Sequence, residues 1–201
     1  QQIQRPDMLR IHLDKPPALT AAELEGFKTF QASYDLNLIG CRNPMPRINE
    51  FDDLLHVIHH HNSKWHEYIF PCTLDAGAHW MENPMRKGGT AHLKHPHQYR
   101  SAFTFGSHKG EYPCLVQAKK IDVWRDSNRN LELDEYNDGE ATAIQIHRAS
   151  KGDRSALVNK WSAGCCVLQT GFAEFMELCY KQKKNGRGSK FSLTVLEGRF
   201  L

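Results

Sequence analysis

Short apolar runs separated by turns recur along most of this chain, and they restrict it to a β-rich fold. Runs of this length, bounded by Gly, Pro or Asn, are typical of strands. Two other segments have helical spacing: one is expected to start at a capping box formed by Thr20 and Glu23, and the other covers residues 171–184. The pattern predicts an α+β fold with an N-terminal helix and a C-terminal helix followed by a strand. The predicted strands cover residues 36–41, 55–60, 65–72, 99–105, 113–119, 121–124, 141–147 and 191–196.

The length of the chain limits how many domains it can form. Its 201 residues, 40% of them hydrophobic, suit one globular domain preceded by an extension. Residues 1–19 are polar and contain three prolines, which is typical of an extended lead-in. We expect residues 1–35 to form an N-terminal extension and helix, and residues 36–201 to form a single catalytic domain.

One motif combines a histidine at the end of an apolar run with a cysteine on a tight turn. Residues 144–147 are Ile-Gln-Ile-His, and residues 161–165 are Trp-Ser-Ala-Gly-Cys. A thiol becomes a strong nucleophile when a neighbour takes its proton, and imidazole is the usual partner. A glycine before the cysteine allows a sharp turn whose backbone N–H groups face a developing oxyanion, and a serine there can hold the imidazole or the turn. The structural alternative is a buried His and Cys in the core. The expected catalytic residues are Cys165, His147, Ser162 and Gly164.

These residues resemble the catalytic motif of the YkuD-type L,D-transpeptidases. That family carries a His, a gap of roughly fifteen residues and then Ser/Thr-His-Gly-Cys, usually with an Arg two positions further on. In this chain the gap separates His147 from the Ser-Ala-Gly-Cys turn, and Cys165 takes the place of the nucleophile. Ala163 stands where the second His is expected. Val167 stands where the Arg is expected, and Arg148 is the candidate substitute.

The resemblance implies a YkuD-like catalytic domain that acts on peptidoglycan stem peptides at L,D bonds and requires no cofactor. In that family's reaction the cysteine forms a thioester with the substrate. An amine would resolve this thioester in a transpeptidase, and water would resolve it in a carboxypeptidase or endopeptidase. The expected substrate-binding residues are Arg148, His108 and Trp161. For His108 the favoured interpretation is exposure at the tip of a turn covering residues 106–110.

A wider likeness and the cysteine content bear on where the protein acts. The order of Gly106, His108, Gly110 and Tyr112, followed by Leu-Val-Gln and Trp-Arg-Asp, is similar to bacterial and phage proteins that end in the same Ser-Ala-Gly-Cys turn. With a catalytic Cys165, the six cysteines allow at most two disulfides. The cysteine content favours an extracytoplasmic location, periplasmic or secreted, or an association with phage. The first residue is Gln rather than Met, which indicates processing such as removal of a signal peptide.

Two segments suggest metal sites. Asp126, Asn128, Asn130 and Asp134 place oxygen atoms at alternate positions, as a Ca²⁺ loop does, although an Asx-rich turn explains the same residues. Histidines are also dense between residues 56 and 66, and on a helix they would suit a metal-dependent hydrolase. We expect instead a hairpin turning at residues 62–64, which divides these histidines between two faces.

Charge and hydropathy exclude two classes of partner. The formal net charge is +3 with no long basic run, which argues against nucleic acid. No apolar stretch approaches the roughly 18 residues that a membrane span needs. A non-catalytic module that binds the cell wall with the same fold is the remaining alternative to an enzyme.

Overall fold

A computed structural model describes residues 8–151 and 155–201 of the chain, so residues 1–7 of the predicted extension and residues 152–154 lie outside the described part. Of the described residues, 42% lie in strands and 14% in helices, which confirms a β-rich fold with few helices. The strands are β1 (Leu9–His12), β2 (Asn37–Arg42), β3 (Asp53–His61), β4 (Lys64–Thr73), β5 (Thr90–Leu93), β6 (His97–His108), β7 (Tyr112–Gln117), β8 (Ile121–Asp126), β9 (Asn137–Ala141), β10 (Gln145–Arg148), β11 (Cys166–Leu168) and β12 (Lys190–Glu197). The helices are α1 (Pro17–Leu24), α2 (Ala78–Glu82) and α3 (Phe172–Lys184).

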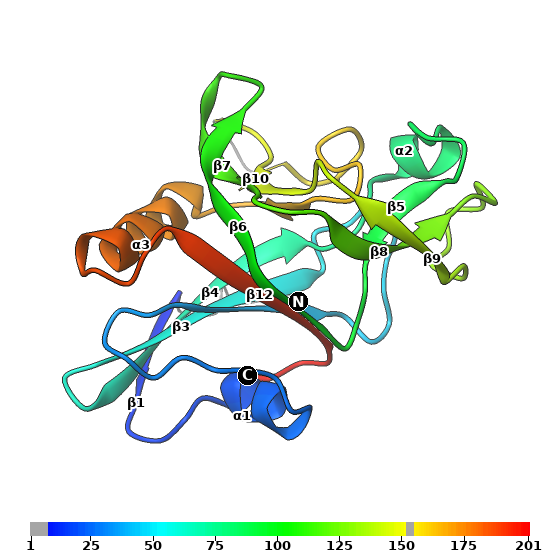
Figure 1. Ribbon diagram of the computed structural model, residues 1–201. Helices are drawn as coiled ribbons and strands as arrows, with labels where there is room; N and C mark the ends of the chain where they lie inside the picture. Colours follow the sequence, from blue (N-terminus) through cyan, green and yellow to red (C-terminus); the bar gives the residue numbers. More distant parts are fainter. Residues whose placement is uncertain (1–7, 152–154) are drawn as a thin grey trace.

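The larger sheet closes on itself. Its strands follow the order β4-β11-β10-β7-β6-β12-β2-β3, and β3 pairs again with β4, which completes a ring. The pairs β10–β11 and β12–β2 are parallel, and the other pairs in the ring are antiparallel. Strand β1 is added beside the first half of β4. A smaller sheet with the order β5-β8-β9 lies next to α2, on the side of the molecule opposite α3 (Figure 1).

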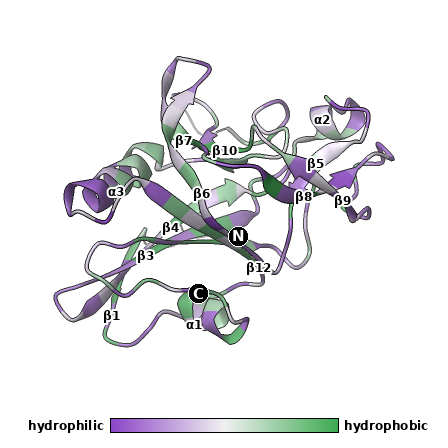
Figure 2. Cartoon of the chain, in the orientation of Figure 1, coloured by the Kyte–Doolittle hydropathy of each residue, from purple (hydrophilic) through white to green (hydrophobic). Residues whose placement is uncertain are grey.

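Apolar side chains of the ring, the small sheet and α3 form the main core. Leu38, Phe70, Phe103 and Leu193 belong to it, and Phe175 joins them from α3. Strand β2 is buried along its whole length because α1 covers its other face. Figure 2 shows that the last turns of α3 and the far end of the β3–β4 hairpin are hydrophilic. Strands that are covered on both faces have continuous apolar runs, which is what residues 36–41 show.

The first helix starts earlier and is shorter than the sequence predicts. It begins at Pro17, with Pro16 at the N-cap and no side-chain cap, so the expected capping box at Thr20 is wrong. A proline in the first turn already has the φ angle of a helix, which favours a start there. The helix ends because Gly26, at φ +81°, donates its N–H to Glu23 and turns the chain away.

The predicted strand at residues 141–147 is divided between the two sheets. Its first residue ends β9, and β10 begins only at Gln145. Between them, the Gln117 side chain donates to the carbonyl of Ala141 (2.8 Å) and accepts from the N–H of Ile144 (2.6 Å). These two bonds replace those of a strand ladder, so the chain can cross from the small sheet to the ring without leaving buried polar groups unpaired.

Candidate active site

His147 lies on β10, and Cys165 directly precedes the neighbouring strand of the ring, β11. Ile146 of β10 is in register with Cys166 of β11, and both belong to the buried core. Side chains alternate along a strand, so His147, which follows Ile146, and Cys165, which precedes Cys166, point to the other face. A strand spacing of about 4.8 Å and a rise of about 3.3 Å per residue place their Cα atoms about 8 Å apart. Both side chains line one cavity of about 670 Å³.

The protonation of His147 is fixed by its surroundings. Its Nδ1 lies 2.8 Å from the backbone oxygen of Arg148, and a carbonyl only accepts, so Nδ1 carries the proton and Nε2 is left as an acceptor. The hydroxyl of Tyr112 donates to the same oxygen (3.3 Å). Burial, with smaller contributions from the nearby His108 and Lys109, lowers the pKa of His147 to about 4, against the opposing effect of the bond to Arg148. The imidazole is therefore neutral at pH 7, and the lone pair of Nε2 is available as an acceptor.

The thiol of Cys165 is also neutral at rest. Burial raises its pKa to about 12, while the N–H of Gln145, 3.3 Å from Sγ, acts in the opposite direction. An amide that donates to sulfur favours the thiolate over the thiol. Since His147 and Cys165 are both uncharged, the proton must move during attack on a substrate rather than before it.

The turn before the cysteine is held by Ser162. Its buried hydroxyl donates to the carbonyl of Cys165 (2.9 Å) and accepts the N–H of Gly164 (3.2 Å). Ser162 thus fulfils the second of its two expected roles, holding the turn. That backbone N–H groups around Gly164 and Cys165 face an oxyanion stays a prediction, and of these groups the Gly164 N–H is used within the turn. Gly164 has φ +120°, and a Cβ added there would lie 2.4 Å from the carbonyl oxygen of Ala91.

His108 lies against His147 and is not an exposed tip residue as expected. It is half-buried at the end of β6, and its ring stacks on His147 at 4.3 Å with an interplanar angle of 24°. Its Nδ1 lies 2.7 Å from Oε1 of Gln145. Gln145 therefore contacts both His108 and Cys165. Sequence reasoning gave this glutamine no role, although it is two positions before His147 and thus on the same face of the strand.

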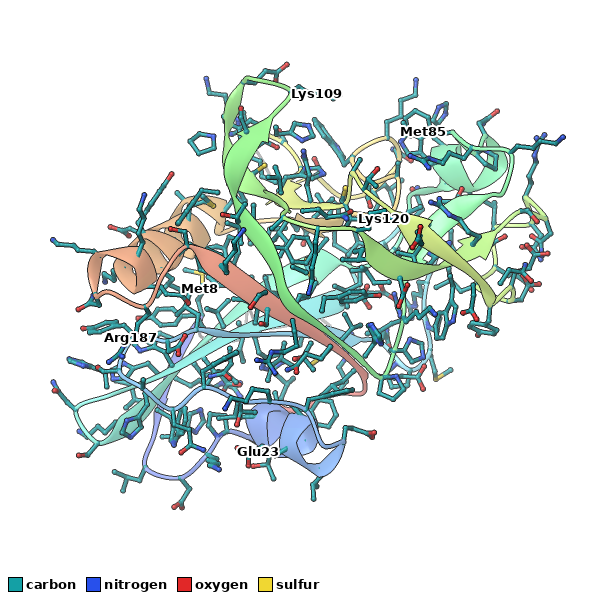
Figure 3. All side chains as sticks on the ribbon, in the orientation of Figure 1. Met8, Glu23, Met85, Lys109, Lys120 and Arg187 are labelled. Carbon is teal, nitrogen blue, oxygen red and sulfur yellow. The ribbon has the colours of Figure 1, made fainter. Side chains whose placement is uncertain are left out.

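The other expected substrate-binding residues lie around the same cavity. The Arg148 guanidinium stacks over the ring of Tyr112 at 4.1 Å, and Trp161 is 44% exposed at the rim. The described lining is strongly basic, with Glu111 as its one carboxylate. Such a lining attracts an anionic ligand. Its cationic side chains are Arg86, Lys109, Arg125, Arg148, Lys151 and Lys160. In Figure 3, Lys109 at the tip of the β6–β7 hairpin and Met85 beyond α2 lie on opposite sides of the site.

Comparisons with protein-family models, curated proteins and solved structures found no match.

The proposed calcium loop forms contacts among its own side chains. The amides of Asn128 and Asn130 donate to the two oxygens of Asp134, at 2.8 and 2.7 Å. Asp126 is buried at the end of β8, where one oxygen lies 3.9 Å from His92. Across residues 8–151 and 155–201, no group of three or more His, Cys, Asp or Glu side chains is placed to hold a metal ion.

The histidine-rich segment forms the expected hairpin, β3 and β4. His56 is fully buried and bonds Glu67 at 2.7 Å, while His59 stacks on His66 at 5.1 Å. These side chains are thus divided between the two faces, as predicted. The six cysteines are free thiols, all buried except the half-buried Cys165. In the part of the chain that the structure describes, no helix combines the length and apolar character needed to cross a membrane.

Proposed function

We propose that this chain is a cysteine enzyme of the L,D-transpeptidase type, with a YkuD-like catalytic domain, acting on peptidoglycan stem peptides. One observation carries the proposal: His147 on β10 and Cys165, directly before the adjacent parallel strand β11, line one cavity, and the bond at Nδ1 leaves Nε2 of the imidazole as the acceptor. An extracytoplasmic or phage-associated location belongs to the same proposal.

In the first half of the reaction, Sγ of Cys165 attacks the carbonyl carbon of the L-centre before the scissile bond. Nε2 of His147 takes the thiol proton as the carbon–sulfur bond forms. The imidazolium that forms is stabilised because its Nδ1–H donates to the carbonyl of Arg148. The tetrahedral species then collapses, and His147 returns the proton to the leaving nitrogen. D-alanine departs and leaves the rest of the stem bound to Cys165 as a thioester.

In the second half, an amine from another stem, or water, attacks the thioester carbonyl. His147 takes a proton from the attacking group, and the carbon–sulfur bond breaks. The thiolate recovers the proton from the imidazolium, which restores the neutral pair. The choice between amine and water decides whether the enzyme is a transpeptidase or a hydrolase.

Arg148 is the candidate for holding the carboxylate of the leaving D-alanine. It follows the base on β10, and its planar fork suits a carboxylate. The stack on Tyr112 restricts this long side chain, so less conformational entropy is lost on binding.

The test is mass spectrometry of purified tetrapeptide muropeptides after incubation with the protein. We expect loss of D-alanine or a new crosslink with the unmodified chain, and none with Cys165→Ala. The matched control is Cys114→Ala, which removes a neighbouring buried thiol that does not line the cavity.

The same measurement can contradict the proposal. No product from a folded, reduced protein would refute it and favour the cell-wall-binding module, which predicts binding to sacculi that is indifferent to alkylation of Cys165. Full activity in Cys165→Ala would refute the role of the thiol.

A further inference from the structure

Arg125 presents a half-buried positive charge to the cavity. Its Nη1 donates to the carbonyl of Gly89 (3.2 Å) and its Nη2 to the carbonyl of Glu140 (2.6 Å). The Glu140 carboxylate itself binds Lys120 at 2.9 Å. The adjacent Asp126 points to the opposite face of β8 and is buried there. Among the described residues, no carboxylate lies within ion-pair distance of Arg125.

A second guanidinium lies close to the first. Arg86, on the loop between α2 and β5, lines the same cavity and is exposed. Burial lowers the pKa of Arg125, and the charge of Arg86 lowers it further. Two like charges beside a cavity wall repel each other, and a bound anion offsets that cost. Arg125 uses two of its five N–H donors on carbonyls, so donors remain for a ligand.

The two arginines lie on the side of Cys165 opposite Arg148. Arg125 pairs across the small sheet with Ala91 of β5. The carbonyl of Ala91 in turn packs against Gly164, directly before the nucleophile. One strand, β5, thus separates Arg125 from the turn that carries Cys165. Arg148 instead lies on β10 and pairs with Leu168, in the segment that follows Cys165.

We propose that Arg125 and Arg86 form a second anion subsite, which binds a carboxylate of the ligand on the opposite side of Cys165 from Arg148. The cavity then selects a ligand with two anionic groups that flank the reacting carbonyl. Naming this ligand as a stem peptide rests on the proposed function, whereas anion binding at the two arginines does not. In a stem peptide, the group is a free carboxylate upstream of the scissile bond, so stems amidated there are poorer substrates.

The first test compares two synthetic stem peptides that differ only in carboxylate or primary amide at the upstream position. We expect Arg125→Gln to lower kcat/KM for the acid by about tenfold or more and to leave the amide nearly unchanged. Arg125→Lys keeps the charge without the fork, and we expect an intermediate loss. The control is Lys120→Gln, which removes an exposed cation that does not line the cavity (Figure 3).

The second test needs no turnover. Iodoacetate is an anion and iodoacetamide is neutral, and both alkylate the same thiol. The rate with iodoacetate divided by the rate with iodoacetamide at Cys165 therefore reports whether the cavity attracts anions. At low ionic strength and pH 9, we expect this ratio to fall about three- to tenfold in Arg125→Gln and Arg86→Gln, and to be unchanged in Lys120→Gln.

These results separate the two proposals. A fall in the ratio without any action on stem peptides keeps the anion subsite and refutes the enzyme. An unchanged ratio, or an equal loss of kcat/KM for the acid and amide peptides, overturns the subsite whatever the activity. Should Arg125→Gln fail to fold, the exposed Arg86→Gln decides the question by the same ratio.

Discussion

Gly164 is a position where one added methyl group should disturb the turn before Cys165. At φ +120° an L side chain costs about 1–3 kcal/mol of backbone strain. The added Cβ of Gly164→Ala would also lie 2.4 Å from the oxygen of Ala91, so backbone must move by at least about 0.6 Å. Overpacking of this kind costs about 1–3 kcal/mol. We expect Gly164→Ala to lower the free energy of unfolding by about 2–5 kcal/mol.

Urea unfolding measures this loss, and Gly110→Ala is the matched control. Gly110 also has a left-handed φ, +73°, but a Cβ there meets nothing within 4 Å. The control carries only the backbone term of about 1–2 kcal/mol. With an m value of about 2 kcal/mol/M, Gly164→Ala should shift the midpoint by about 1–2.5 M. If Gly164→Ala is no less stable than Gly110→Ala, the close approach to Ala91 is not what positions the turn.

Three further predictions concern the histidines and the thiol. With a pKa of about 12, Cys165 should react with iodoacetamide roughly 50–100-fold more slowly at pH 7.5 than free cysteine, and its rate should rise up to at least pH 10. An apparent pKa below 8 in that profile would show a preformed ion pair instead. Because the folded pKa of His147 lies below its unfolded value, its contribution is complete above about pH 6.5 and is lost as the pH falls towards 4. Urea titrations should therefore show about 3 kcal/mol more acid destabilisation in the unmodified chain than in His147→Gln, and equal curves would contradict the shift. Finally, His108→Ala should lower turnover about tenfold more than His108→Phe, which keeps a ring against His147. Equal losses in the two variants would assign the effect to the Gln145 bond alone.

The parts of the fold that follow from short-range patterns were predictable. The β3–β4 hairpin and α3 were both expected close to their observed bounds. Period-two and period-3.6 patterns act over a few residues, so one sequence is enough to detect them. The start of α1 was missed because a capping box at Thr20 and a proline at Pro17 both fit the rules, and only packing on β2 decides between them.

The closure of the ring was not predictable. Strand β12 pairs in parallel with β2, about 150 residues earlier in the chain, and no local pattern carries that information. For the same reason sequence gave Arg125 and Gln145 no place in the site. Arg125 lies forty residues before Cys165 and approaches it only because β5 lies between β8 and the turn. His147 and Cys165 were recognisable because the spacing of a short motif places them together.

The position of His147 and Cys165 within the ring has a consequence for how long the site persists. Strands β10 and β11 have neighbours on both sides, so this pair has no edge at which hydrogen exchange can begin by fraying. Separating β10 from β11 therefore requires opening the ring itself. The hairpin and loops around the cavity can therefore move while β10 and β11 stay paired. The side-by-side placement of these two strands lasts as long as the folded domain does.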